Sequence, residues 1–579
     1  MKIPSRFQSL LLATSAVMAL SACSGSDPSS PGASSVIATL PPANNAPDTP
    51  TANPDAIDLT FGGCPIGTTA ATLPNSAVTA CQIIVDGFGN ITSDLTLTAS
   101  ASQPRAYFVE QATFIGTDDG PTPGALGGST VDLTIQGGAT LVFLNSTDFL
   151  TVNRGSRLIA TGSAAAPIAL TSDEDIIDDG VANDSQGSAR GQWGGLILNG
   201  RAPINSCADP SVPAMCEASG EGGTGTYGGD NPADDSGVLN YVRVQYAGFA
   251  ITPGNELNGI AFQGVGSGTN VDFIQVHNND DDGVEFFGGT VNVRHVVITG
   301  VDDDAFDWVA GWTGSAQDVL NIGSGVGDNG FEGDNNSSLN DQTPRSNPMI
   351  SNFTMIGGPS EDLGMQIREG TAGVFINGIV SGWEDGCLDI DDSATFNQVD
   401  PSATIDSGAT DLQFSSLFFS CETPLDDFTD SDGTVDEPFS DIASFPGITV
   451  GNSTLSGVLP GANEAAVASI DASTVDPALV NEAFIGAFAP GLAPADTWAF
   501  GWTVPGSVFP PQGCPVGTTD ITGGPSVPAA PSGGAVCEIP TAVTQDLTLT
   551  NGNLYALAGA VFVGQDAGCL LYTSPSPRD

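Results

Sequence analysis

Lysine is almost absent from this chain of 579 residues: Lys2 is the only one, and arginine supplies the rest of the 12 basic residues. Aspartate and glutamate number 67, so the formal net charge is −55. Phosphate binding requires clustered cations, so this balance excludes nucleic acid as a partner. It also excludes a lysine nucleophile or Schiff base in the mature chain. The acidic surplus fits either a solvated acidic surface or a surface that binds divalent cations.

Several motif classes are also missing. The 10 cysteines form no CxxC pair, and no Cys/His spacing typical of structural zinc occurs. A nucleophile elbow, a P-loop and an HExxH motif are absent as well. His277 and His295 are the only two histidines. The sequence therefore lacks the usual signatures of serine hydrolases, nucleotide-binding proteins and zinc proteases.

The first 23 residues predict an export signal. Lys2 and Arg6 precede an apolar stretch that ends in Leu20-Ser21-Ala22-Cys23. This pattern is typical of a bacterial lipoprotein signal peptide, in which Cys23 becomes the lipidated N-terminus. Ser24 at the next position is typical of sorting to an outer membrane. We therefore expect a lipoprotein anchored in the outer membrane, on the periplasmic or extracellular face.

The two ends of the chain differ in composition from the rest. Residues 24–58 are rich in Ser, Pro, Ala and Asn, which predicts a flexible tether without a core. Residues 569–579 (CLLYTSPSPRD) resemble the translation of a sequencing adapter and are excluded from reasoning about the fold. On that interpretation the natural protein continues beyond Gly568.

A short repeat indicates the fold class. Residues 271–286 and 293–308 align at an offset of 22 residues, with alternating apolar positions and an acidic triplet in each copy. Such a repeat predicts an all-β, right-handed parallel β-helix whose coils lie about 4.8 Å apart. Residues 133–142 align with 150–159 at an offset of 17, and residues 353–367 align with 376–390 at an offset of 23. We expect the β-helix to span residues 59–508.

The acidic triplets are candidate cation ligands. Calcium takes six to eight oxygen ligands, and stacked acidic turns would supply them. No segment fits an EF-hand loop or a calcium-binding nonapeptide, so solvated acidic turns remain the alternative. The candidate Ca²⁺ ligands are Asp280, Asp281, Asp282, Asp302, Asp303, Asp304 and Asp328.

The repeat also predicts one outward column of carboxylates, which would contain Glu285, Asp307, Glu332 and Asp389. Glu285 and Asp307 on adjacent coils would be about 5 Å apart, close to the spacing of a retaining glycosidase. His277 and His295 lie nearby in the sequence and are candidate proton donors or acceptors. Any acidic ladder produces the same spacing, so none of these residues is singled out as catalytic.

A β-elimination reaction on a polysaccharide would need a different set of groups. It typically uses Ca²⁺ together with an arginine or lysine base, and Arg294 and Arg368 are available. Trp308 and Trp312 could stack on sugar rings, but the alternation places Trp308 in the core.

Eight cysteines remain after Cys23 and Cys569 are set aside, and an even number in an exported chain predicts disulfides. They fall into sequence neighbours, although sequence alone leaves the connectivity open: Cys64/Cys81, Cys207/Cys216, Cys387/Cys421 and Cys514/Cys537. The segment around Cys64 (FGGCPIGTT) recurs around Cys514 (PQGCPVGTT). Residues 509–568 are therefore expected to begin a second tandem module.

Motifs between residues 60 and 395 resemble a group of exported bacterial β-helix lipoproteins. They include WGGLILNG at 193–200 and DGVEFFGGT at 282–290. The resemblance implies fold and location but no established activity. We expect a surface binding module, adhesin-like or structural, supported by Ca²⁺ and able to bind polysaccharide or other cell-surface components. The alternative is a polysaccharide lyase or glycoside hydrolase that uses the acidic coil face.

Overall fold

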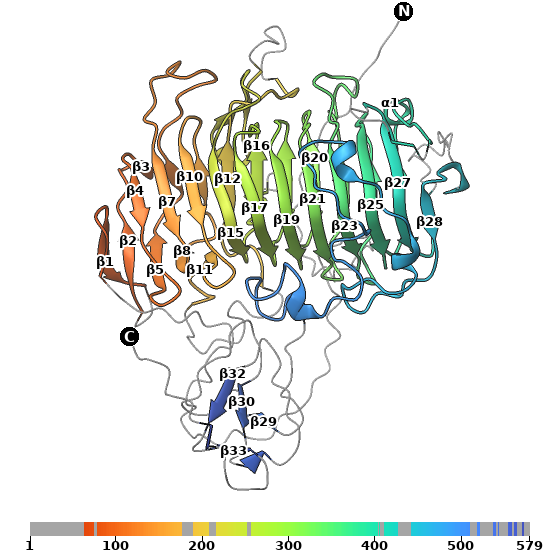
Figure 1. The fold of residues 1–579 in the computed structure, drawn as a ribbon. Helices are drawn as coiled ribbons and strands as arrows, with labels where there is room; N and C mark the ends of the chain where they lie inside the picture. Colours follow the sequence, from red (N-terminus) through yellow and green to blue (C-terminus); the bar gives the residue numbers. More distant parts are fainter. Residues whose placement is uncertain are drawn as a thin grey trace, which may run out of the picture. The chain divides into compact units, whose positions relative to one another are not determined.

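The computed structural model describes residues 63–74, 78–176, 189–207, 216–251, 256–402, 404–405, 410–426, 442–509, 518–520, 536–539, 542–543, 554–557, 561–563 and 570–571. The chain winds into a parallel β-helix built from two long sheets (Figure 1). None of the helices in the described ranges has the length and apolar character needed to cross a membrane. The prediction of an all-β solenoid is confirmed.

Sheet A has 16 strands and sheet B has 10. Within them, every strand pair is parallel except β1 with β2. Sheet A contains β1 (Thr68–Thr72), β2 (Thr79–Ile83), β4 (Leu95–Leu97), β5 (Arg105–Val109), β7 (Asp132–Gln136), β8 (Ala139–Phe143), β10 (Arg157–Thr161), β11 (Ile168–Ser172), β15 (Gly237–Gln245), β17 (Asn270–His277), β19 (Asn292–Thr299), β21 (Ser315–Ile322), β23 (Met349–Ile356), β25 (Gly373–Ser381), β27 (Leu412–Ser420) and β28 (Ile448–Val450). Sheet B contains β3 (Asn90–Ile91), β6 (Thr113–Ile115), β9 (Leu150–Val152), β12 (Leu196–Asn199), β16 (Ile260–Gln263), β18 (Val284–Phe287), β20 (Phe306–Val309), β22 (Phe331–Gly333), β24 (Met365–Ile367) and β26 (Asp389–Ile390).

The remaining elements are short. They are the pair β13 (Ala218–Ser219) and β14 (Thr226–Tyr227), the helix α1 (Ser393–Phe396) and the 3-10 turns η2 (Glu221–Gly223), η3 (Ile442–Ser444), η4 (Glu464–Ala466), η5 (Ala472–Thr474) and η6 (Pro494–Asp496). Six further strands are β29 (Thr519–Asp520), β30 (Val536–Ile539), β31 (Ala542–Val543), β32 (Leu554–Leu557), β33 (Val561–Val563) and β34 (Leu570–Leu571).

The 22-residue repeat matches the strand register. Val271 pairs with Val293 in β17 and β19, and Glu285 pairs with Asp307 in β18 and β20. The 17-residue alignment is wrong as a coil repeat, because Leu133 pairs with Leu158 and not with a residue of β9. That offset aligns β7 of sheet A with β9 of sheet B, and then aligns β8 with β10 within sheet A.

The 23-residue alignment holds in one sheet only. Gln366 pairs with Asp389 in sheet B, as the alignment predicts. In sheet A, however, Phe353 pairs with Gly378, two positions beyond Ile376. Turns of unequal length separate the two sheets, so one offset does not describe a whole coil.

Each long strand of sheet A from β15 to β27 bends at one residue. The bends lie at the same position in successive coils, between paired residues on either side. A positive φ is uncommon outside glycine, and a residue in this conformation redirects the strand. The bend residues are Tyr241 (φ 54), Phe273 (φ 55), His295 (φ 50), Asp318 (φ 60), Asn352 (φ 55), Asn377 (φ 57) and Ser416 (φ 56).

One apolar core runs between the sheets. Phe286 stacks on Phe262 with ring centroids 4.9 Å apart and on Trp312 at 4.1 Å. Trp308 is fully buried in this core, so its predicted inward orientation is confirmed. Burial of large aromatic side chains is the main favourable term in the folding of such a coil.

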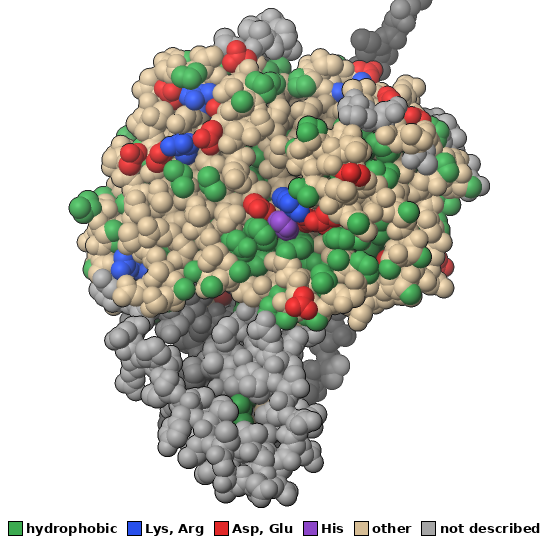
Figure 2. All heavy atoms as spheres, in the orientation of Figure 1, with side chains coloured by type: hydrophobic (Ala, Val, Ile, Leu, Met, Phe, Trp, Pro, Cys, Tyr) green, Lys and Arg blue, Asp and Glu red, His purple; other side chains and the backbone are tan. Residues whose placement is uncertain are grey.

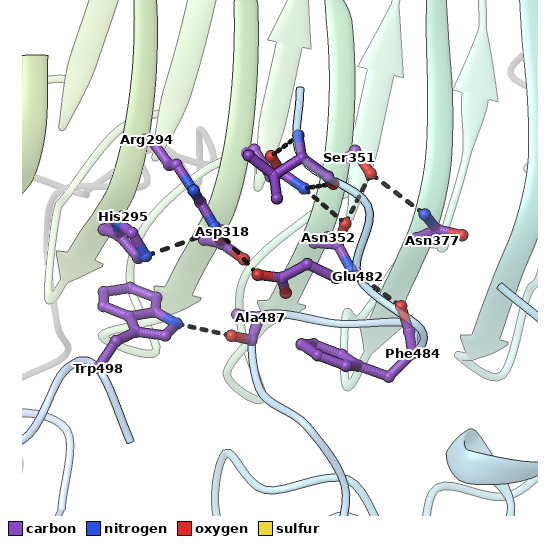
Figure 3. A network of polar contacts seen from close by, with 12 residues as sticks. Arg294, His295, Asp318, Ser351, Asn352, Asn377, Glu482, Phe484, Ala487 and Trp498 are labelled. Carbon is purple, nitrogen blue, oxygen red and sulfur yellow. Dashed lines mark hydrogen bonds and ion pairs between the residues drawn. The ribbon is translucent and has the colours of Figure 1, made fainter. Parts of the chain in front are cut away.

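Residues 452–509, here called the strap, lie against the outer face of sheet A. Trp502 and Phe488 of the strap share an apolar cluster with Val297 and Leu320 of the sheet. Asn352 donates through Nδ2 to the carbonyl of Phe484 at 2.9 Å (Figure 3). Figure 1 shows the strap in blue, crossing in front of the sheet.

Where both cysteines lie in the described ranges, three disulfides join sequence neighbours: Cys64–Cys81, Cys207–Cys216 and Cys387–Cys421. Neighbour pairing is thereby confirmed for these three couples, whereas Cys514 of the fourth lies outside the described residues. β29 pairs antiparallel with β30, just as β1 pairs antiparallel with β2. Cys537 is then opposite Tyr555 in the next strand, as Cys81 is opposite Tyr107. The proposed second module stays a prediction that this similarity supports.

Candidate functional site

The acidic triplets lie in the turns between sheet A and sheet B, after β17 and after β19. The first member of each triplet, Asp280 or Asp302, lies near Arg190. Arg190 Nη1 is 3.4 Å from Asp302 Oδ1, and the charge of Arg190 also acts on the carboxyl group of Asp280. The third member of each triplet, Asp282 or Asp304, accepts a hydrogen bond from a backbone N–H group of the next coil. Asp282 Oδ1 accepts from the N–H of Asp304 at 3.1 Å, and Asp304 Oδ1 accepts from the N–H of Asn329 at 2.8 Å.

In the part of the chain that the structure describes, three groups of carboxylates come close enough to share a cation. In each group, the three potential ligand oxygens lie within 4.8 Å of one another. The groups are Glu256 with Asp281 and Asp303, Asp282 with Glu285 and Asp307, and Asp282 with Asp303 and Asp304. We call these seven residues the acidic face.

The acidic face contains four of the seven predicted cation ligands. Asp280 and Asp302 are not among them because they lie beside Arg190. Asp328 lies one coil further on, and its carboxyl interacts with Asp362. Glu256 was missed by sequence reasoning because it precedes the repeat and no internal copy marks it.

The predicted carboxylate column is present in sheet B. Glu285, Asp307 and Glu332 are paired in succession, Gln366 follows, and Asp389 pairs with Gln366. Glutamine therefore interrupts the column before its last member.

Burial dominates the electrostatics of the acidic face. It raises the pKa of Asp282, Glu285, Asp304 and Asp307 well above the usual range, and repulsion between neighbouring carboxylates adds to the effect. Burial together with Asp307 raises the pKa of Glu332 to about 9. The carboxyl groups therefore resist ionisation as long as no cation balances them.

Arg368 is the basic side chain that contacts this region. Its Nη2 is 2.7 Å from Glu332 Oε2, and its Nε is 3.0 Å from Asp334 Oδ1. Burial acts to lower the pKa of Arg368, but Asp334 and Glu332 outweigh it and raise the pKa above its ordinary value. Arg368 therefore stays charged.

Several buried oxygens in this region have no hydrogen-bond partner. They include Asp307 Oδ1 and Asn329 Oδ1, whose residues are only 7% and 4% exposed. An unpaired buried oxygen is costly, and a buried carboxylate is more so. Carboxylate and amide oxygens are the ligands that Ca²⁺ prefers, so the donor set fits this ion.

The histidines do not join the carboxylates. Both lie in sheet A, whereas Glu285 and Asp307 lie in sheet B. His277 Nδ1 is 2.8 Å from Thr299 Oγ1, and burial lowers the pKa of His277 to about 3. His295 Nδ1 is 2.6 Å from Asp272 Oδ1. The prediction that His277 and His295 serve the Glu285–Asp307 pair is wrong, because the strand that carries each histidine belongs to the other sheet.

Arg294 is likewise separate from the acidic face. Its Nε is 2.8 Å from Asp318 Oδ2, and its Nη2 is 3.0 Å from Glu482 Oε1 of the strap (Figure 3). Sequence reasoning missed this contact because 188 residues separate Arg294 from Glu482. Of the two arginines considered, it is Arg368 whose charge acts on carboxyl groups of the acidic face, those of Asp303 and Asp307.

A protein-family model described as a pectate-lyase like beta helix domain matches residues 125–441 of the chain. This stretch begins before β7 and contains the whole acidic face. No curated protein and no solved structure matches the chain.

Proposed function

We propose, on the premise that this chain belongs to the pectate-lyase-like β-helix family, that it binds polysaccharide at the acidic face with the help of Ca²⁺. The observation that carries the proposal is the cluster of buried carboxylates, with Asp307 Oδ1 unpartnered, inside the matched region. Family membership supports carbohydrate as the ligand class. The donor chemistry supports a hard divalent cation.

Two sets of residues would hold cations. Asp282, Glu285 and Asp307 form the more buried set, and Glu256 with Asp281 and Asp303 forms the other. Bound Ca²⁺ would supply positive charge that neutralises the carboxylates and attracts acidic sugars. Without such charge, a chain of net charge −55 repels a polyanion.

Arg368 contributes a fixed cation at the same face. Because Glu332 and Asp334 keep it charged, it attracts an anionic sugar but is a poor proton acceptor. This property favours binding over β-elimination. A lyase remains the second candidate, since the family description and the position of Arg368 both point to it.

Glycoside hydrolysis is less well supported. Glu285 and Asp307 have oxygens within 4.8 Å, close to the spacing of a retaining enzyme. However, the residues are only 8% and 7% exposed, which limits the access of a sugar ring to both carboxyl groups.

The test is a retention assay with the full chain, in which polygalacturonate and a neutral glycan are compared in Ca²⁺ and in excess EDTA. We expect Ca²⁺-dependent retention of the acidic polymer, at least tenfold weaker for Asp307→Asn. Asp280→Asn is the matched control, because Asp280 lies in the turn that carries Asp281 and Asp282 but outside the acidic face. Equal retention in Ca²⁺ and EDTA would overturn the proposal. Release of unsaturated sugar, lost in Arg368→Gln, would make the protein a lyase.

We further propose that the protein is exported and anchored through a lipid on Cys23 in the outer membrane, where it works as an adhesin-like module. The signal-peptide pattern of the sequence supports this location, and residues 1–62 lie outside the described residues. Cys23→Ala should move the protein from the membrane fraction to the soluble fraction. Unchanged membrane association would contradict lipid anchoring at this residue.

A further inference from the structure

The outer face of sheet A carries a groove that is separate from the acidic face. It has a volume of about 380 Å³ and lies where β17, β19 and β21 begin, beside Ala478 and Leu479 of the strap. Figure 2 shows this side of the molecule, with a histidine beside basic and acidic side chains near its middle. The surroundings are uncharged polar and hydrophobic surface.

Two rows of polar side chains line the groove. Asn270 pairs with Asn292 in the first row, and Asn292 Oδ1 accepts from the N–H of Ser315 at 2.9 Å. The second row, two positions further along the strands, consists of Asp272, Arg294 and Gln317. Residues between the rows belong to the core, so both rows face outward.

The side chains of the second row are held in place by their neighbours. Asp272 is 2.6 Å from His295, and Arg294 is bound by Asp318 and Glu482. Gln317 donates to the carbonyl of Val480 at 2.7 Å and accepts from its N–H at 2.8 Å. The second row is therefore oriented before any ligand arrives, which reduces the entropy lost on binding.

His295 is itself fixed by aromatic contacts. It stacks on Phe273 at 4.1 Å, Phe273 stacks on Tyr241 at 4.3 Å, and Trp498 meets His295 edge-on at 4.9 Å. These rings stack on one another, so they support Asp272 and are not a platform for a ligand.

The chemistry of the groove limits the class of ligand. Asp272, Glu482 and the nearby Asp476, which accepts from Ser315 Oγ at 2.6 Å, outnumber Arg294, so an anion is disfavoured. The strands of the floor are paired on both sides, so an extended peptide cannot add to the sheet. Leu479 and Ala478 provide only a small apolar wall.

We propose that this groove binds a neutral saccharide without a metal ion. Sugar hydroxyls both donate and accept, as the carboxylate of Asp272, the guanidinium of Arg294 and the amides of Asn270 and Asn292 require. The exposed side chain of Ala478 offers a small apolar contact to the C–H groups of a ring. The inference does not rest on Ca²⁺ or on the acidic face, which lies on the other sheet.

The experiment is calorimetric titration of the full chain, in excess EDTA, with neutral cello-, xylo-, manno- and malto-oligosaccharides. We expect at least one of them to bind. Asn270→Ala and Asn292→Ala should each weaken that binding at least tenfold. Asn240→Ala is the matched control, because Asn240 precedes Asp272 in the second row but does not line the groove.

Each remaining outcome has a defined meaning. Asp307→Asn should leave saccharide binding unchanged, so failure here and failure at the acidic face are distinguishable. No binding by any of the four sugars would overturn the proposal. The proposal would also be overturned if Asn270→Ala and Asn292→Ala bound the saccharide as tightly as the wild-type protein while their thermal melts were unchanged. Binding of an unrelated neutral peptide with the same sensitivity to the two variants would assign the groove to peptides instead.

Discussion

The outer face of sheet A and the acidic face differ in how their charged side chains are balanced. On sheet A, Arg294 lies between Asp318 and Glu482, so cation and carboxylates are paired directly. On the acidic face, carboxylates meet carboxylates, and Asp307 Oδ1 has no partner. The same core and coil spacing support both arrangements. On sheet A, Arg294 offsets part of the repulsion between buried carboxylates, although burial and Glu482 still raise the pKa of Asp318 to about 8. The buried carboxylates Asp282, Glu285 and Asp307 of the acidic face form no ion pair with an arginine, so protons or added cations must balance them.

A change of pH should expose this difference most strongly. The acidic carboxyl groups have folded pKa values above their unfolded values near 4, so the folded state binds more protons. Their contribution to stability is therefore present below about pH 4 and is lost as the pH rises toward about 9, the value for Glu332. The free energy of unfolding in EDTA should decrease across this window by about 1.4 kcal/mol per pKa unit and group, so melting temperatures should fall. Ca²⁺ should flatten the profile, and Mg²⁺ at equal ionic strength should do so less.

Opening a cavity in the shared core should weaken both faces together. Phe286→Ala removes a ring that stacks on Phe262 and Trp312, at an expected cost of about 3–5 kcal/mol. Urea unfolding measures this cost. Phe88, which is 85% exposed, provides the control, since Phe88→Ala should change stability little. A loss confined to one face would mean that the faces do not depend on a common core.

Neutralising one acidic residue should stabilise the protein in EDTA. Asp307→Asn removes repulsion with Glu285 and is expected to add about 1–3 kcal/mol at pH 8. The same change should abolish most of the stabilisation by Ca²⁺. If Asp307→Asn destabilises the protein in EDTA, the carboxylates of the acidic face do not repel one another.

A substitution at the contact between sheet A and the strap should destabilise the protein, in contrast to Asp307→Asn. Asn352 is buried, has φ 55 and donates to the carbonyl of Phe484. Asn352→Ala should cost about 1–3 kcal/mol through the lost hydrogen bonds, plus the strain of alanine at positive φ. Asn352→Gly retains the backbone conformation, so the difference between the two variants isolates the strain. Equal stability of all three proteins would show that the strap is not held at this point.

An exposed ion pair should matter least. Arg157 and Asp132 are paired at 2.6 Å, but their side chains are 41% and 36% exposed. Arg157→Ala should therefore change stability by no more than about 1 kcal/mol, and the change should vanish in high salt. A larger loss in thermal or urea unfolding would show that surface pairs contribute to sheet A.

Local repetition made part of this architecture predictable. The register of β17 with β19 and of β18 with β20 follows directly from the 22-residue repeat, as does the Glu285–Asp307 pair. Glu256 and Glu482 could not be found in this way, because neither belongs to a repeated segment. Their contacts depend on how a loop and the strap return to the solenoid.

The position of the histidines illustrates a second limit. His277 is eight residues from Glu285 in the sequence, yet the intervening turn transfers the chain from sheet A to sheet B. Proximity in sequence is therefore a poor guide where each coil changes direction. The failed 17-residue alignment has the same origin, since similar apolar patterns occur in both sheets.

The disulfides have a consequence for how the solenoid ends. Cys64–Cys81 fastens the first strand pair, and Cys387–Cys421 joins the region before β26 to the end of β27. A stack of coils would otherwise unzip from its terminal rungs, and the freed strand edges would recruit other chains into fibres. The antiparallel pairing of β1 with β2 adds a reversed, short rung at one end. In an oxidising environment, these disulfides thus act as covalent clasps that oppose end-to-end polymerisation of the coils.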